Sequence, residues 1–259
     1  EFFLVGDSFV FGNCVNRPHD LSSVLKKISK KSVVNIGYAN NGPLIEYAAL
    51  KEYFLPKMKN IIWIYYETSD LNNLKNELNS KILKKYIEDK NFKQKLIYKQ
   101  NEINDIVNDS IEVEIEKKIN SKRYFEDELT FKVRKFLDLW NVRELLFYSN
   151  LFKKKKEFDP PKEFKKIIKL AQNLAYKNNV NFHFVYLPSY ERYINKTNNE
   201  EYRFIKKTIA DLSINFIDIH EEVFKKEKNP LKLFPFELPG HYTVDGYRKV
   251  GEAIFNKVQ

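Results

Sequence analysis

The sequence predicts an α/β fold, a three-layer α/β/α sandwich with a mostly parallel central sheet. Short apolar runs typical of buried strands alternate along the chain with stretches of helical periodicity. This alternation is typical of a parallel sheet that is covered by helices on both faces. Hydrophobic residues make up 43% of the 259 residues and aromatic residues 15%, which is enough apolar material for a substantial core.

Five apolar runs are expected to be strands, and five segments with helical spacing are expected to cover them. The strands are predicted over residues 2–5, 33–37, 61–66, 180–187 and 215–219, and the helices over residues 21–28, 45–54, 164–178, 200–212 and from Asp245 to the C-terminus. Polar clusters follow three of the strands, at Gly6–Ser8, Asn40 and Glu67–Asp70. Because ligand sites in parallel α/β sheets lie beyond the carboxyl ends of the strands, we expect the functional site there.

The chain is interpreted as one domain, residues 1–259, with a helical insertion over residues 71–150. The inserted segment is rich in Lys, Glu, Asn and Ile, has helical periodicity and contains neither Pro nor Gly. This segment has three interpretations: a lid, an oligomer contact, or a solvated helical excursion without function. The sequence leaves the choice among them open, together with the oligomeric state.

The charge balance of the chain is basic, with 45 Lys and Arg against 35 Asp and Glu and a net charge of +10. The basic residues mix with acidic ones along helical faces, so we expect no nucleic-acid partner. The one cysteine, Cys14, excludes an intrachain disulfide and a cysteine-based metal site. No apolar run approaches the roughly 20 residues of a membrane span. The chain opens at Glu1 without an initiator Met, so we interpret it as a fragment whose compartment, bacterial cytoplasm or periplasm, is open.

Ser8 is the candidate nucleophile. It follows the first predicted strand and precedes an apparent helix that starts at Phe9. Free backbone N–H groups at a helix N-terminus can hold an oxyanion, and Gly6 allows the sharp turn that leads to them. A serine that only caps a helix is the common alternative.

His241 is the candidate general base, in a loop just before the final helix. Imidazole has a pKa near neutrality and is suited to take a proton from a serine hydroxyl. An exposed loop histidine without a role is the alternative. The other histidines are less suited, because His19 follows a proline in a loop, His183 lies inside a strand and His220 ends one.

The two ends of the chain together resemble the SGNH, or GDSL-like, hydrolase family. Gly6–Gly12 is similar to the family's Gly-Asp-Ser block after the first strand, and Asn35–Gly37 to its second block. His241 with Gly246–Tyr247 is similar to the last block. The resemblance spans the chain apart from the insertion, and is greatest to members from bacterial surface-polysaccharide loci. It implies a flavodoxin-like fold, Ser8 as nucleophile, His241 as base, and no metal or organic cofactor.

Three positions depart from the family pattern. Asn40 stands where the family has Gly, Ser69 where it has Asn, and Leu238 where it has Asp. The resemblance implies an oxyanion hole made by the backbone N–H groups of Ser8 and Asn40 with the Ser69 hydroxyl. A serine hydroxyl reaches less far than the amide of Asn, and losing one such donor costs roughly 3–4 kcal/mol, or 10²–10³ in rate.

The histidine lacks the acid that orients it in the family, and three substitutes are open. Glu237 stands four residues before it and is the better side-chain candidate. Asp245 stands four residues after it and is expected to be the N-cap of the last helix. A backbone carbonyl is the third substitute.

Other charged residues follow the predicted strands and are candidates for a supporting role. Asp7 precedes the nucleophile, and Glu67 and Asp70 lie at the expected edge of the site, where they could bind substrate. Arg192 could hold an anionic group of a substrate. We favour instead an ion pair of Arg192 with Glu191 or another acid.

We therefore expect a serine ester hydrolase that acts on a small-molecule or glycan ester, with O-acetyl groups of a glycan as the favoured substrate. Its activity is expected to be weakened by the changed oxyanion and acid positions. One alternative is an O-acyltransferase that uses the same site. The other is a degenerate fold that has been kept for glycan binding or scaffolding.

Overall fold

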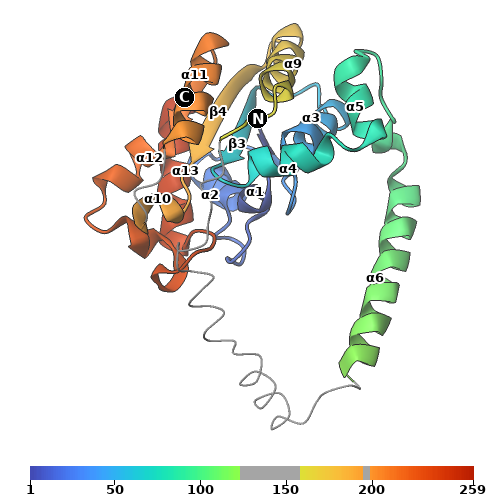
Figure 1. The fold of residues 1–259 in the computed structure, drawn as a ribbon, viewed down its shortest axis with the longest axis horizontal. Helices are drawn as coiled ribbons and strands as arrows, with labels where there is room; N and C mark the ends of the chain where they lie inside the picture. Colours follow the sequence, from blue (N-terminus) through green and yellow to red (C-terminus); the bar gives the residue numbers. More distant parts are fainter. Residues whose placement is uncertain (123–157, 195–198) are drawn as a thin grey trace. The chain divides into compact units, whose positions relative to one another are not determined.

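The computed structural model of this chain describes residues 1–122, 158–194 and 199–259 (Figure 1). These residues belong to two compact units, residues 1–94 with 159–259 and residues 95–158, and each unit is described by itself. The first unit holds all the strands of the described residues and every candidate site residue.

The first unit is built on a five-stranded sheet in the order β2-β1-β3-β4-β5, in which all neighbouring strands are parallel. The predicted parallel sheet is confirmed, and each predicted strand overlaps an observed one. β2 ends at Asn35, earlier than predicted, where the Asn35 side chain accepts from the Gly37 N–H at 2.9 Å in a local turn. The strands are β1 (Phe2–Val5), β2 (Val33–Asn35), β3 (Asn60–Tyr66), β4 (Asn181–Leu187) and β5 (Asn215–Asp218).

Helices follow the strands along the chain, as the alternating pattern predicts. The α-helices of the described residues are α1 (Ser8–Phe11), α2 (Leu21–Ser29), α3 (Pro43–Glu52), α4 (Asp70–Glu77), α5 (Lys81–Glu88), α6 (Gln100–Lys122), α9 (Glu163–Lys177), α10 (Glu191–Ile194), α11 (Glu200–Asp211), α12 (Ile219–Glu222) and α13 (Val244–Val258). Short 3-10 turns are η1 (Leu96–Tyr98), η2 (Phe224–Lys226), η3 (Pro230–Leu233) and η4 (Pro235–Glu237).

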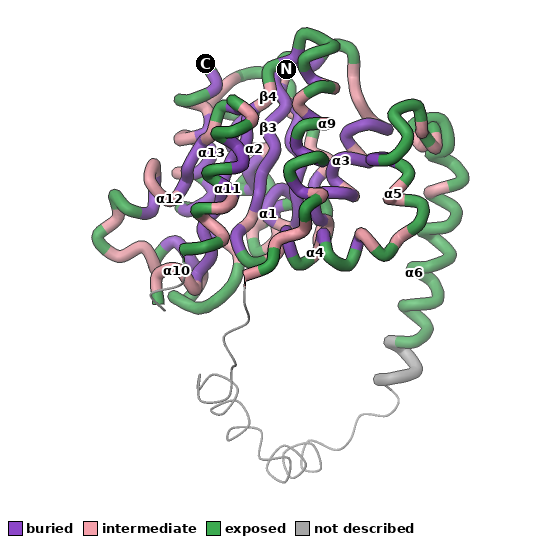
Figure 2. Tube along the Cα trace, turned by 45° about the horizontal axis from the view of Figure 1, so that its top comes forward, coloured by how far each residue is buried: buried purple, intermediate pink, exposed green. Residues whose placement is uncertain are grey.

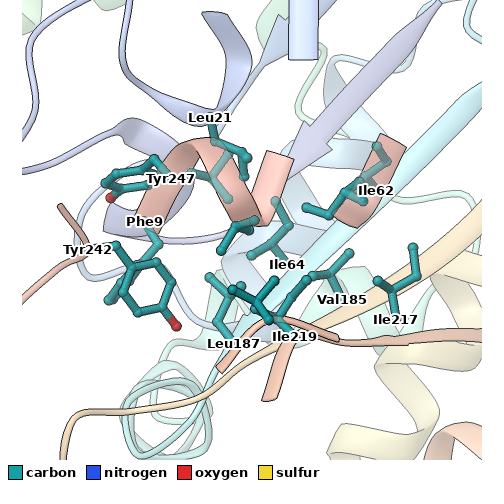
Figure 3. Close-up of a cluster of buried hydrophobic side chains, with 14 of the residues drawn as sticks. Phe9, Leu21, Ile62, Ile64, Val185, Leu187, Ile217, Ile219, Tyr242 and Tyr247 are labelled. Carbon is teal, nitrogen blue, oxygen red and sulfur yellow. The ribbon is translucent and has the colours of Figure 1, made fainter. Parts of the chain in front are cut away.

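One face of the sheet is covered by α2 and α13, which also contact each other. Leu4, Ile62 and Val185 lie on neighbouring strands and point to this face. They pack in one buried core with Leu25 of α2 and Ile254 of α13. Figure 3 shows the strand residues of this core side by side with residues from the C-terminal region.

The opposite face of the sheet is covered by α9, which contacts α3 and β4. Tyr65 of β3 lies with its ring centroid 5.8 Å from that of Phe164 in α9 and 5.8 Å from that of Phe184 in β4. Because successive strand residues point to opposite faces, a sheet covered on both sides is apolar at nearly every central position. The strands β1, β3 and β4 are accordingly mostly buried and lie at the centre of the unit (Figure 2), and the predicted three-layer sandwich is confirmed.

Thr243 is the N-cap of the final helix. Its hydroxyl accepts from the Gly246 N–H at 3.1 Å, and α13 starts at the next residue. The prediction that Asp245 is the N-cap is therefore wrong, because Asp245 already lies in the first turn. Its carboxylate pairs instead with Arg248 at 2.6 Å and with Lys249 at 3.2 Å.

The segment predicted as a helical insertion, residues 71–150, divides between the two units. Helices α4 and α5 belong to the first unit, where both contact α3. Helix α6 belongs to the second unit, and its side chains over residues 100–117 are almost all exposed. Residues 123–150 lie outside the described part of the chain, so the lid or oligomer contact stays a prediction. No helix of the described residues combines the length and the apolar character needed to cross a membrane.

Gly251 marks a close contact between α13 and α2, because a Cβ at this position would lie 2.5 Å from Val24 Cγ1. Gly251→Ala gains about 1 kcal/mol of helix propensity and loses about 1–3 kcal/mol by overpacking. We therefore expect the free energy of unfolding, measured in urea, to fall by about 1 kcal/mol. Val24→Ala in the same chain removes the atom that the new Cβ would meet. The double variant should therefore lose less free energy of unfolding than the sum of the losses in the two single variants. Simple additivity would contradict this interpretation.

Candidate active site

The candidate active site lies at the edge of the sheet where the parallel strands end. Ser8 follows β1, and His241 precedes α13. The two residues are 233 positions apart, and Ser8 Oγ lies 2.8 Å from His241 Nε2. This is hydrogen-bond distance between a hydroxyl donor and an imidazole acceptor. The fold thus joins the two residues that the sequence singled out from opposite ends of the chain.

The turn before Ser8 depends on a close backbone approach at Gly6. A Cβ on Gly6 would lie 2.8 Å from the carbonyl oxygen of Ile64 in the neighbouring strand, so a side chain does not fit there. Asp7 then caps the short helix α1, since its Oδ1 accepts from the Phe9 N–H at 2.9 Å. These two contacts fix the backbone that carries the Ser8 hydroxyl.

The position of His241 depends on buried aromatic residues around it. Tyr242 is wholly buried, and its hydroxyl donates to the Pro188 carbonyl at 2.7 Å. The imidazole centroid lies 4.5 Å from that of Phe9, and Figure 3 shows Phe9, Tyr242 and Tyr247 together at one end of the core. Burial lowers the pKa of His241 below its usual 6.5. The ring is therefore neutral at pH 7, with an Nε2 lone pair that can take a proton.

The second nitrogen of the imidazole faces a thiol. Cys14 Sγ lies 3.6 Å from His241 Nδ1, and no carboxylate of the described residues bonds to this ring. Glu237 is exposed and its carboxylate accepts from an asparagine amide at 3.4 Å, while Asp245 pairs with basic residues of α13. Sequence reasoning missed Cys14, since its place six residues after Ser8 does not distinguish it from other loop residues.

The loop after β2 carries Asn40, and the Tyr38 N–H of this loop donates to the Gly6 carbonyl at 3.3 Å, two residues before the nucleophile. Asn35 ties the start of this loop to α1, because its Nδ2 donates to the Val10 carbonyl at 2.6 Å. Within the residues that the structure describes, the backbone N–H groups of Ser8 and Asn40 donate to no other protein group. Both N–H groups are thus available to an anionic oxygen.

Ser69 and Asp70 follow β3 and bond to each other. The Ser69 hydroxyl donates to Asp70 Oδ1 at 3.2 Å. Asp70 is wholly buried, and its Oδ2 accepts from the Tyr66 N–H at 2.9 Å. Ser69 can therefore donate to a substrate oxygen only by turning its hydroxyl away from Asp70.

Buried carboxyl groups of Asp7, Asp70 and Glu46 are close enough to repel one another. Burial raises the pKa of Asp7 from 3.8 to about 6. Burial and this repulsion hold the pKa values of Asp70 and Glu46 well above their ordinary range. Neither carboxyl oxygen of Glu46 has a hydrogen-bond partner within the described residues. Asp7 Oδ2 lies 3.4 Å from Ser8 Oγ, so the imidazole at 2.8 Å is the closer partner of the hydroxyl.

Glu67 forms a buried ion pair with Arg192, and each side chain is 6% exposed. The guanidinium donates through Nε to Oε2 at 2.9 Å and through an Nη to Oε1. The Ser189 N–H donates to the same Oε2 at 3.0 Å, which links the ends of β3 and β4. The prediction that Arg192 pairs with an acid is confirmed, and the acid is Glu67 rather than Glu191.

The other histidines lie outside these contacts. His183 lies within the sheet, where its Nδ1 is 2.8 Å from Asn215 Nδ2, and His220 Nδ1 lies 2.8 Å from the Tyr193 hydroxyl. His19 is exposed. In the part of the chain that the structure describes, no group of three or more His, Cys, Asp or Glu side chains is arranged as metal ligands.

Arg192→Ala removes the cation from the buried carboxylate of Glu67. We expect the free energy of unfolding, measured by urea denaturation, to fall by about 3–5 kcal/mol, because a buried charge is left without a partner. The control is the double variant Glu67→Leu with Arg192→Met, which leaves no buried charge and should lose much less. Equal losses in the single and the double variant would argue against this account.

Glu46→Gln removes a buried carboxyl group without changing its size. Because folding raises the pKa of Glu46, its contribution to stability is complete below pH 4.5 and is lost as the pH rises toward the folded pKa. The wild type should therefore lose stability relative to Glu46→Gln above pH 4.5, by at most about 1.4 kcal/mol per pH unit. Urea denaturation at pH 5, 6 and 7 measures this difference, with the exposed Glu200→Gln as control. A difference that stays constant with pH would refute the expectation.

Solved structures of other proteins share this fold over almost the whole chain. The chain is similar to a protein assigned to the G-D-S-L lipolytic family from Desulfitobacterium hafniense, with 14% identity and a TM-score of 0.55 over 99% of this chain and 98% of that one. It is similar to an acetyl xylan esterase, with 11% identity and a TM-score of 0.53 over 100% and 99% of the two chains. It is also similar to a member of the G-D-S-L lipolytic family from Veillonella parvula, with 10% identity and a TM-score of 0.51 over 99% and 97%. No protein-family model and no curated protein matches the sequence. The chain therefore has the α/β fold of the G-D-S-L lipolytic proteins, as its resemblance to them implies.

Proposed function

We propose that this chain is an ester hydrolase in which Ser8 is the nucleophile and His241 the general base. The observation that carries the proposal is the 2.8 Å distance between Ser8 Oγ and His241 Nε2. A nucleophile and a base within hydrogen-bond reach are the minimal arrangement for acyl transfer through a serine. The shared fold with G-D-S-L lipolytic proteins supports the same reaction class.

The reaction proceeds in two steps through an acyl-enzyme. Ser8 Oγ attacks the ester carbonyl carbon while its proton passes to His241 Nε2. His241 then gives this proton to the leaving alkoxide as the carbon–oxygen bond breaks, which leaves the acyl group on Ser8. A water molecule attacks the acyl-enzyme, with His241 again taking the proton, and the acid is released as Ser8 recovers its hydrogen.

The oxyanion that forms in each step is held by hydrogen-bond donors of the chain. The backbone N–H groups of Ser8 and Asn40 are the proposed donors, because neither donates elsewhere among the described residues. The Ser69 hydroxyl is a weaker third donor, since it bonds to Asp70 at 3.2 Å. We therefore infer a working site of reduced strength. Asp7 and Asp70 support the site through the backbone groups that they bond, and Glu67 supports it through Arg192 and Ser189.

The proposed substrate is an acetyl ester of a glycan. One of the similar structures is that of an acetyl xylan esterase. An exposed aromatic pair beside the nucleophile supports this choice. Phe11, one turn after Ser8 on α1, is 52% exposed, and its ring centroid lies 5.6 Å from that of Tyr38, which is 63% exposed. Rings of this kind offer apolar area against which the face of a sugar can pack.

Ser8→Ala tests the proposed reaction with two measurements. A fluorophosphonate probe should label wild-type protein at Ser8, and hydrolysis of 4-nitrophenyl acetate should fall by about 10³-fold or more in Ser8→Ala. Ser29→Ala is the control, because this hydroxyl bonds only to backbone groups away from the site, donating to the Leu25 carbonyl and accepting from the Lys31 N–H. Acetylated xylooligosaccharides, offered with and without an excess of unacetylated acceptor, separate hydrolysis from acyl transfer. An unlabelled wild type without turnover that depends on Ser8 would leave a glycan-binding or scaffold protein as the better description.

A further inference from the structure

We propose that Cys14 is the positioning residue that holds the imidazole of His241 in place of the missing acid. The proposal rests on the function proposed above and assigns a role that no other residue of the described chain fills. The geometry that carries it is the 3.6 Å distance between Cys14 Sγ and His241 Nδ1, opposite the nitrogen that contacts Ser8. Ser8 and Cys14 thus bracket the ring, one at each nitrogen.

The loop that carries Cys14 is tied to both catalytic elements. The Gly12 and Asn13 N–H groups each donate to the Ser8 carbonyl at 3.1 Å. On the other side, the Tyr247 hydroxyl of α13 donates to the Asn13 carbonyl at 3.2 Å. The thiol is therefore held by the same two segments that supply the nucleophile and the base, so its distance to the imidazole is set by the site itself.

The role of His241 as a general base determines which atom of this contact donates the hydrogen and which atom accepts it. Nε2 must carry a lone pair to take the proton of Ser8, so the ring hydrogen must be on Nδ1. The Nδ1–H group then needs an acceptor, and Cys14 Sγ is the one that the structure provides. A thiol sulfur is a weak acceptor, but it can orient the ring and select this tautomer.

A cysteine at this place affects the pKa of the histidine differently from an aspartate. A carboxylate at this distance would stabilise the imidazolium and raise the pKa of the histidine. Here burial alone shifts the pKa of His241, and it shifts it downward. Among the described residues, the titratable groups next to the ring or its partners are Cys14 at Nδ1, Asp7 behind Ser8, and Tyr247, whose hydroxyl donates to the Asn13 carbonyl beside Cys14. The base should therefore stay unprotonated, and the site active, at a more acidic pH than with a carboxylate partner.

Substitutions at Cys14 can distinguish the effect of a hydrogen-bond acceptor from the effect of a negative charge. Cys14 has a left-handed backbone with a φ of 69°, which Asn and Asp also adopt readily. Cys14→Ala removes the acceptor, Cys14→Asn offers a neutral oxygen, and Cys14→Asp offers the same shape with a negative charge. The pair Asn and Asp differs only in charge and is therefore the matched control.

The expected results are distinct for each variant. Cys14→Ala should lower kcat for 4-nitrophenyl acetate about 3- to 10-fold, with KM changed by less than about twofold, because one weak hydrogen bond to the base is lost. Cys14→Asn should recover most of this loss. Cys14→Asp should move the acidic limb of the kcat/KM profile upward by about one pH unit or more relative to Cys14→Asn. Nitrogen NMR of His241 should find the hydrogen on Nδ1 in the wild type.

Two results would overturn the role of Cys14 while leaving the proposed reaction intact. The first is normal fluorophosphonate labelling of Ser8 together with an unchanged kcat and pH profile in Cys14→Ala. The second is an NMR spectrum in which the hydrogen sits on Nε2 of the wild type. Labelling on Cys14 instead of Ser8 would make the thiol the nucleophile and overturn both proposals. Absence of any labelling or turnover in the wild type overturns the proposed function, and the role of Cys14 in it fails with it.

Discussion

The contact between Ser8 and His241 depends on the parallel pairing of the strands. Parallel strands bring all their carboxyl ends to one edge, so the turn after β1 lies close to the chain that follows β4. Tyr242 bonds to the Pro188 carbonyl just after β4, and His241 is the residue before it. A hydrogen bond over 233 positions is thus made by one local turn and one buried tyrosine hydroxyl. The Thr243 N–H, two residues after His241, donates to the Leu233 carbonyl at 2.8 Å and fixes the same segment from its other side.

Burial shifts the pKa values of the ionisable groups at the carboxyl edge of the sheet. Burial raises the pKa of Asp7 to about 6 and lowers that of His241, so both groups shift toward their neutral forms. A neutral imidazole suits a general base, because its lone pair can take a proton. The buried ion pair of Glu67 with Arg192 is a different case, because here a fixed cation holds a carboxylate within the fold. Its contacts to Ser189 indicate a structural role for Glu67 at the end of the sheet.

The proposed site offers a substitute at each of the three positions that depart from the SGNH pattern, and two of these substitutes are weaker than the group they replace. Asn40 keeps a backbone N–H group, and the Ser69 hydroxyl can donate to a substrate only by turning away from Asp70. In our proposal, the thiol of Cys14 takes the place of the carboxylate. The hydroxyl and the thiol are weaker hydrogen-bond partners than the amide and the carboxylate, whereas the backbone N–H group of Asn40 is the same donor as that of Gly. We expect the proposed site to favour esters with good leaving groups, because the departure of such groups needs less stabilisation by the oxyanion donors and less help from the acid that protonates the alkoxide.

Local pattern was sufficient to predict the strands, most of the helices, the parallel sheet and the turn that carries Ser8. The period of a strand or helix and the chemistry of a turn involve residues close in sequence, and these interactions survive in every fold that such a segment can join. The partner of His241 Nδ1, the pairing of Arg192 with Glu67 rather than Glu191, and the burial of Glu46 beside Asp7 and Asp70 could not be predicted in this way. These contacts depend on how separate segments pack, and sequence neighbours such as Glu237 and Asp245 were misleading because nearness along a loop does not fix the direction of a side chain. Packing over long sequence distances decided which groups the nucleophile and the base would meet.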